Sequence, residues 1–181
     1  MGLSYDWTAL NTKVDAMYPN GNTNQAVGLP WGWQSLTESP FTIPAFDPKY
    51  SYKQIIILLT DGMNAWSSAN NHNKSVYSSF GYYGAGRLTD PGGANPTTSA
   101  AARAQMEAKT LSACGNAKAA GVTVYTVGFS VSSDPIDATG LDLLKKCASS
   151  PQMAYVANDS STIVTVFEEI AKSIGGLRLT Q

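Results

Sequence analysis

Apolar residues along the chain alternate between a helical period and short unbroken runs. Residues 53–60 form one such run, and residues 122–129 form a second. Runs of this kind are typical of strands that are covered on both faces in a parallel sheet. Residues 153–157 predict a third, shorter strand. Apolar positions three or four residues apart predict helices over 7–17, 25–36, 99–120 and 138–149, and a last helix that Asp159 caps and that reaches Ile174.

Strands and helices therefore follow one another in βα units. Right-handed crossovers then give an α/β fold, a Rossmann-like parallel sheet of about three core strands with helices on both faces. The 181 residues suit a single domain over 1–181. The closing residues 177–181 alternate like an edge strand.

Residues 62–98 form a long polar and aromatic loop insertion with no helical or strand period. A connection of this length is usually functional or mobile. Its clustered aromatic residues predict either a recognition surface or a small core belonging to the loop itself. They are Tyr77, Phe80, Tyr82 and Tyr83.

Charged residues make up only 14% of the chain, against about 25% in an average soluble domain, a balance that favours an exported protein. Twelve basic and 13 acidic residues give a net charge of −1, so nucleic acid is not an expected partner. The longest apolar run, 55–59, is far too short to span a membrane. The first residues lack the features of a signal peptide, so an export signal would lie outside this chain.

The cysteine pattern excludes a thiolate zinc site. The chain has two cysteines, Cys114 and Cys147, and one histidine, His72, which is too few ligands of the right kind. A Cys/His nucleophile is not expected either, because the chain has one histidine and no second polar cluster lies near either cysteine. Two buried thiols or a disulfide remain as alternatives.

Asp61 is the sharpest candidate for chemistry. It directly follows the apolar run, and Gly62 allows the backbone to turn away. An Asx turn that closes the strand would explain it without any function. A metal role would require further hard oxygen ligands, and Thr23 is the best candidate. Because carboxyl ends of parallel strands meet at one edge, Asp134 is expected there as well.

Several sequence blocks resemble a known family. Residues 20–24, Gly28, the run into Asp61-Gly62, and residues 122–129 followed by Asp134 are similar to the later two thirds of a von Willebrand factor type A domain. More narrowly, five blocks resemble the C-terminal part of TadG-like proteins of bacterial Tad (Flp) pilus assembly. These blocks are residues 15–24, 31–37, 53–62, 147–151 and 177–181.

The resemblance implies a metal-ion-dependent adhesion site for Mg²⁺ or another divalent cation. Thr23 matches the family's threonine and Asp61 its later aspartate, but the D-x-S-x-S turn is absent from this sequence. The resemblance places that turn upstream of Met1, which makes the site incomplete. We therefore expect this chain alone to bind a metal weakly or not at all.

The resemblance also implies an open sheet edge and a disulfide. In the family, the first strand of the domain lies beside the strand predicted here at 53–60. The resemblance places that first strand outside this chain, so the 53–60 strand would have an uncovered flank through which the chain can self-associate. TadG-like chains carry cysteines at matching positions on the helices that flank the middle strand, which implies a Cys114–Cys147 bond.

The expected function is a non-enzymatic adhesion or assembly module of the bacterial cell envelope, located outside the cytoplasm and related to Tad pili. It would bind a protein partner at the carboxyl-terminal face of the sheet. The residues expected at that surface are Asn22, Asn24, Gly62, Asn64 and Asp134. One alternative is a metal-dependent hydrolase of alkaline-phosphatase type, suggested by residues 58–63, although a single histidine argues against it. A fragment with no independent function is another.

Overall fold

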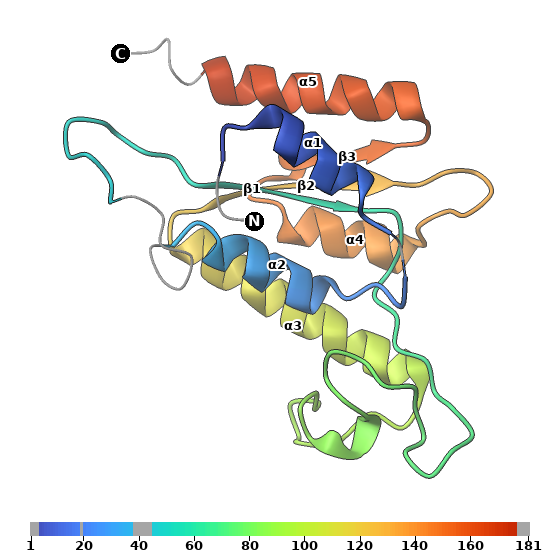
Figure 1. Ribbon diagram of the computed structural model, residues 1–181. Helices are drawn as coiled ribbons and strands as arrows, with labels where there is room; N and C mark the ends of the chain where they lie inside the picture. Colours follow the sequence, from blue (N-terminus) through green and yellow to red (C-terminus); the bar gives the residue numbers. More distant parts are fainter. Residues whose placement is uncertain (1–3, 19, 38–44, 177–181) are drawn as a thin grey trace.

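The computed structural model describes residues 4–18, 20–37 and 45–176. Three parallel strands form one sheet in the order β1–β2–β3 (Figure 1). The strands are β1 (Ile55–Thr60), β2 (Thr123–Phe129) and β3 (Ala154–Ala157). The helices are α1 (Trp7–Asp15), α2 (Gln25–Gln34), α3 (Ser99–Ala119), α4 (Ala138–Cys147) and α5 (Ser160–Gly176), with short 3₁₀ turns η1 (Tyr83–Ala85) and η2 (Pro151–Met153).

Helices cover both faces of the sheet, as the sequence predicts. In Figure 1, α2, α3 and α4 lie on one side of the strands and α5 lies on the other. The alternation of side chains along β2 explains this division, because successive residues of a strand point to opposite faces. Val124 packs with α2 and α3, whereas Tyr125 and Val127 pack under Val166 of α5. The predicted α/β fold is confirmed.

Side-chain caps set the starts of the helices. Asn24 accepts a hydrogen bond from the backbone of Val27, Thr98 from Ala101, and Asp137 from Gly140. Asp159 caps α5 by accepting from the N–H of Thr162 at 2.7 Å, as the sequence predicts. These hydrogen bonds satisfy amide groups that the first helical turn leaves unpaired. The tail at 177–181 lies outside the described residues. No helix within the described ranges is long and apolar enough to cross a membrane.

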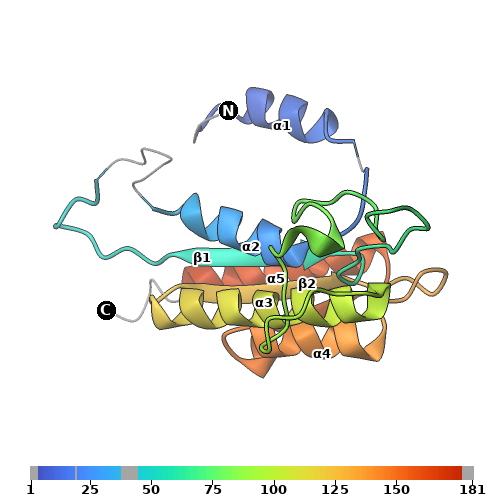
Figure 2. The ribbon, with the colours of Figure 1, turned by 90° about the horizontal axis from the view of Figure 1, so that it is seen from below.

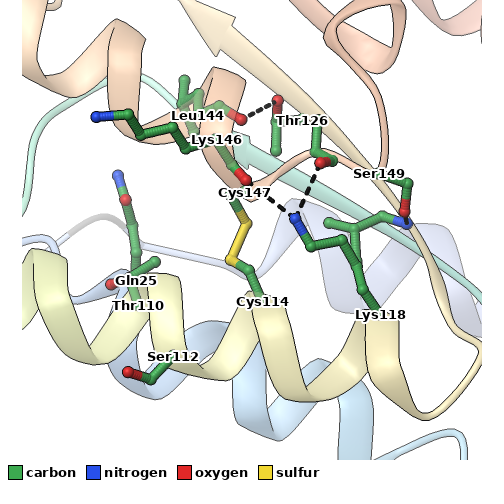
Figure 3. The surroundings of a disulfide bond; sticks show 12 residues. Gln25, Thr110, Ser112, Cys114, Lys118, Thr126, Leu144, Lys146, Cys147 and Ser149 are labelled. Atoms are coloured by element: carbon green, nitrogen blue, oxygen red, sulfur yellow. Dashed lines mark hydrogen bonds between the residues drawn. A yellow bond between two sulfur atoms is a disulfide. The ribbon is translucent and has the colours of Figure 1, made fainter.

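The disulfide that the resemblance implied is present between Cys114 and Cys147, whose Cα atoms are 5.2 Å apart. It joins α3 to the end of α4 (Figure 3). Lys118 reinforces the junction, because its ammonium group donates to the carbonyl oxygens of Lys146 and Ala148 at 3.0 and 3.1 Å. A cationic side chain at a helix C-terminus satisfies carbonyl groups that the helix itself leaves free.

The outer edge of β1 pairs with no other strand of the described chain. The carbonyl of Gln54 accepts from Thr123 of β2, so alternate residues of β1 face that neighbour. The backbone groups of Ile55, Ile57 and Leu59 therefore point away from the sheet. Figures 1 and 2 place α1 beyond this edge and apart from the sheet.

Helix α1 forms where the sequence predicts it, but its apolar stripe is exposed. No residue of α1 is buried, and Trp7 and Val14 are 71% and 60% exposed. The helix is therefore held by its own hydrogen bonds and by the Asp6 cap rather than by a core.

The long 62–98 loop has a small core of its own. Trp66, Tyr83 and Leu88 are buried against Ala102 and Met106 of α3. The sequence left open whether the aromatic residues of this loop form a recognition surface or a small core. Phe80 and Tyr83 belong to the core. Tyr77 lies outside the core and is 71% exposed, in edge-on contact with Tyr82.

Candidate functional site

The two predicted metal-ligand positions lie on neighbouring loops at the carboxyl-terminal edge of the sheet. Asp61 is exposed directly after β1. The Thr23 hydroxyl lies against the next residue, since a Cβ on Gly62 would be 3.5 Å from its Oγ1. The Thr23 carbonyl also accepts from the N–H of Ala65 at 3.0 Å. Two segments far apart in the sequence are thereby joined at the edge where parallel α/β folds bind ligands.

A buried polar network holds these loops together. The Asn64 side chain accepts from the backbone N–H of Gln25 at 2.8 Å, and the Gln25 amide donates to the Gly62 carbonyl at 3.0 Å. Thr60 and Thr110 complete the network. Asn64, Gln25 and Thr110 are almost wholly inaccessible to solvent, so the hydrogen bonds compensate their desolvation.

This network corrects one expectation. Asn64 was expected at the partner surface, but its side chain is only 1% exposed. An asparagine after an exposed turn is ordinarily a surface residue. Here its amide oxygen accepts from the backbone N–H of Gln25 at the start of α2, and its amide nitrogen donates to the side chains of Gln25 and Thr110, so the residue is drawn inward. Asn64 therefore positions the site and is not available to a partner.

The other expected surface residues differ in accessibility. Asn22 and Asp134 are exposed, and Gly62 is half-buried. Asn24 is also half-buried, and both ends of its amide are occupied: Oδ1 caps α2, while Nδ2 donates to Ser79 Oγ at 2.6 Å. Of the residues expected at this surface, Asn22 and Asp134 are therefore the exposed polar ones, and Asp61 is exposed as well.

Thr23 and Asp61 bring two of the oxygen ligands that a divalent cation needs to this edge. The oxygen atoms of Thr23 and Asp61 are ligands that Mg²⁺ prefers, but its near-octahedral shell needs more of them. Within the described part of the chain, no three His, Cys, Asp or Glu side chains gather closely enough to hold a metal. Two protein ligands would leave most of the shell to water.

An ion-pair cluster beside this edge, formed by Arg103, Asp137 and Glu107, was not predicted from the sequence. Arg103 of α3 donates from both terminal nitrogens to the Asp137 carboxylate, at 2.6 and 2.7 Å, and from Nε to Glu107 at 2.6 Å. The spacing of Arg103 and Glu107 on one helix was readable as an i,i+4 pair. The contact with Asp137 depends on how α3 meets α4, which local sequence does not reveal.

The Arg103–Asp137 ion pair makes the stability of the fold depend on pH. The hydrogen bonds from Arg103, and then the one from the Gly140 backbone, lower the pKa of Asp137 from 3.8 to about 2. A carboxyl group whose pKa is lower in the folded state stabilises the fold above its unfolded pKa, and this contribution is lost as the pH falls from about 4 to 2.

We therefore expect Asp137→Asn to reduce the fall in unfolding free energy between about pH 4 and 2. Asparagine retains the helix cap but not the charge. Urea titrations across this range measure the effect. Asp159, whose pKa is also lowered to about 2, leaves a residual slope in the variant. An unchanged slope would show that the Asp137 charge does not stabilise the folded chain.

The strand order and the helices on both faces define a parallel α/β domain whose candidate site lies at the carboxyl ends of the strands. No protein-family model and no curated protein matches the sequence. Two bacterial pilus proteins of known structure share the fold. The pilus adhesin SpaC of Lactobacillus rhamnosus GG, in its open conformation, aligns with 92% of this chain at 20% identity and a TM-score of 0.60. This chain spans 21% of the SpaC chain.

The second structure is the vWF domain of the type V pilus tip protein Mfa5 from Porphyromonas gingivalis. It aligns with 93% of this chain at 15% identity and a TM-score of 0.58, and 72% of its own chain is covered. The chain therefore has an α/β fold of the von Willebrand factor A type. At these identities the likeness concerns the fold alone.

Proposed function

We propose that the chain is a non-enzymatic adhesion or assembly module of the bacterial cell envelope, related to Tad pili, that binds a protein partner at the carboxyl-terminal edge of its sheet. The observation that carries this proposal is the hydrogen-bonded junction of the 22–25 and 61–65 loops, which presents the exposed residues Asn22 and Asp61 at the carboxyl end of β1. The SpaC and Mfa5 structures support the pilus relation, because both proteins are pilus components with this fold.

The disulfide supports a location outside the cytoplasm. Disulfide bonds persist in oxidising compartments and are rare where thiol reductants are abundant. The Cys114–Cys147 bond lies in the buried core between α3 and α4, so it is part of the scaffold. We infer an extracytoplasmic module, in the periplasm or at the cell surface.

Binding to pili tests the proposed function. Pili purified from a bacterium that carries the gene are immobilised, and the oxidised chain is applied at increasing concentration. We expect saturable binding that an Asn22→Ala, Asp61→Ala double variant weakens at least about tenfold, as expected when central polar contacts are lost. Lys172→Gln, on the exposed side of α5, is the matched control and should bind like the wild type. No saturable binding, or equal binding by the double variant, would contradict the proposal.

We further propose that the chain alone binds a divalent cation weakly or not at all. Thr23 and Asp61 account for two oxygen ligands, and an acidic group of the partner would be a suitable additional ligand. The scarcity of histidine supports this account over a phosphatase-like hydrolase, because two-metal hydrolases of that type need several histidine ligands.

The open edge of β1 supports self-association. Leu59 is 46% exposed, and the backbone groups of Ile57 and Leu59 are oriented toward a new strand. We expect light scattering after size-exclusion chromatography to show a mass that rises with concentration. Leu59→Lys places a charge on this edge and should keep the chain monomeric. A concentration-independent monomer in the wild type would contradict self-association through β1.

A further inference from the structure

The 62–98 loop contains a pocket that lies apart from the site proposed above. Its volume is about 780 Å³, within the range of small-molecule pockets. Segments 68–74, 82–85 and 95–97 form its walls. The lining residues that matter for the inference are Asn73, Lys74, Tyr82, Asn95 and Thr97.

Hydrogen bonds hold two of the three segments that line the pocket, 68–74 and 82–85. Trp66 donates from its indole nitrogen to the Val76 carbonyl at 3.0 Å, and the Tyr83 hydroxyl donates to the Trp66 carbonyl at 2.7 Å. The Ser75 hydroxyl accepts from the backbone of Tyr83, and the Ser99 hydroxyl of α3 accepts from the backbone of Ser68. A preformed pocket loses less conformational entropy on binding than a flexible loop would.

The charge of the lining favours an anion. None of the described residues that line the pocket is Asp or Glu, whereas Lys74 contributes a cationic side chain. Lys74 makes none of the ion pairs found among the described residues. Asp90, in the same loop, accepts from the backbone of Ala94 and does not line the pocket.

The backbone of Lys74 adds a second observation. Its φ is +61°, and it is the one non-glycine residue with positive φ in the described ranges. Glycine would adopt this conformation more easily, so a lysine here carries a conformational cost. Costs of this kind recur at functional sites. The backbone of Lys74 is held in this conformation by a turn, in which its N–H donates to the Asn71 carbonyl and its carbonyl accepts from the N–H of Ala69, both at 3.1 Å. The turn thereby places Lys74 on the wall of the pocket.

We propose that this pocket binds a carboxylate-bearing sugar, such as a uronic acid. Lys74 would pair with the carboxylate, because a charged donor forms the stronger hydrogen bonds. The amides of Asn73 and Asn95 and the hydroxyl of Thr97 can donate to and accept from sugar hydroxyls. The Tyr82 ring offers an apolar surface to the sugar ring. The proposal does not depend on pilus binding, which involves other residues.

A chemical-shift titration tests the proposal with three probes: sodium D-glucuronate, D-glucose and sodium acetate. Glucuronate carries both the ring and the carboxylate, while each of the others lacks one. We expect saturable shifts with glucuronate, confined to 68–74, 82–85 and 95–97, at millimolar concentration. Glucose and acetate should bind at least about fivefold more weakly, since each loses one set of contacts.

Variants assign the contact. Lys74→Gln should weaken glucuronate binding about tenfold, in line with the loss of a charge-assisted hydrogen bond. Lys74→Arg, which retains the charge, should bind more tightly than Lys74→Gln, and Lys172→Gln on α5 should match the wild type. Amide spectra of each variant show whether the loop keeps its fold.

Three outcomes would overturn the proposal. Equal binding of glucose would exclude the role of the carboxylate, and equal binding of acetate would exclude the sugar. An absence of shifts at the pocket, or shifts that Lys74→Gln leaves unchanged, would exclude the site. The Asn22→Ala, Asp61→Ala double variant should bind glucuronate like the wild type. A failure of glucuronate binding can therefore be distinguished from a failure of pilus binding.

Discussion

Replacing both Cys114 and Cys147 by alanine is expected to lower the free energy of unfolding by about 3–4 kcal/mol, the chain-entropy value for a loop of this length. The bond closes a separation of 33 residues and joins α3 to the end of α4, so its loss frees the unfolded chain without removing either helix. For a domain of this size the melting temperature should fall by roughly 10 °C. Thermal unfolding followed by circular dichroism measures the change.

Reductant provides the matched control for this prediction. Wild-type protein treated with a strong thiol reductant should melt near the temperature of the double variant, and the variant itself should be insensitive to the reductant. The residues Cys114 and Cys147 are fully buried, so alanine also removes some packing in the core. A double variant that melts with the wild type would show that the bond does not stabilise the fold.

Trp66→Ala is expected to cost about 3–5 kcal/mol, the usual range when a buried aromatic side chain is removed. Trp66 is 2% exposed, stands edge-on to Tyr83, and donates to the Val76 carbonyl. The substitution removes the centre of the loop core and leaves that carbonyl without its partner. Because the loop packs on α3, the damage should spread from 62–98 to the start of that helix.

Hydrogen exchange locates this effect. Amides in 66–83 should lose protection first, while those of β2 should follow the global free energy of unfolding. Trp7→Ala is the control, since Trp7 is 71% exposed on α1 and should change stability by less than about 0.5 kcal/mol. Equal losses for Trp7 and Trp66 would mean that the loop has no core of its own.

The periodic elements of the fold were predictable from local sequence. The runs at 53–60 and 122–129 correspond to β1 and β2, and the caps at Asn24 and Asp159 begin helices where the sequence places them. Local patterns suffice here because strand burial and helix capping depend on neighbouring residues. The strand and helix bounds differ from the predicted ones by one or two residues, as they commonly do.

The features that the sequence did not disclose all depend on contacts between distant segments. Asn64 is buried because its amide meets Gln25, and Arg103 is paired because α3 passes the start of α4. The 62–98 loop has no period, since its core is assembled around Trp66 and Tyr83 by a non-repeating path. Thr23 and Asp61 were proposed together from their oxygen ligands and then from the resemblance, and their loops do meet at one edge of the sheet.

The measurement that tests the central claim most directly is a titration of the oxidised chain with MgCl₂, followed by amide chemical shifts. If Thr23 and Asp61 are the remaining ligands of an incomplete cation site, any shifts should centre on residues 22–24 and 61–62, with no saturation below millimolar Mg²⁺, and Asp61→Asn should abolish them. Saturation at micromolar Mg²⁺, or shifts centred elsewhere and unaffected by Asp61→Asn, would contradict the account.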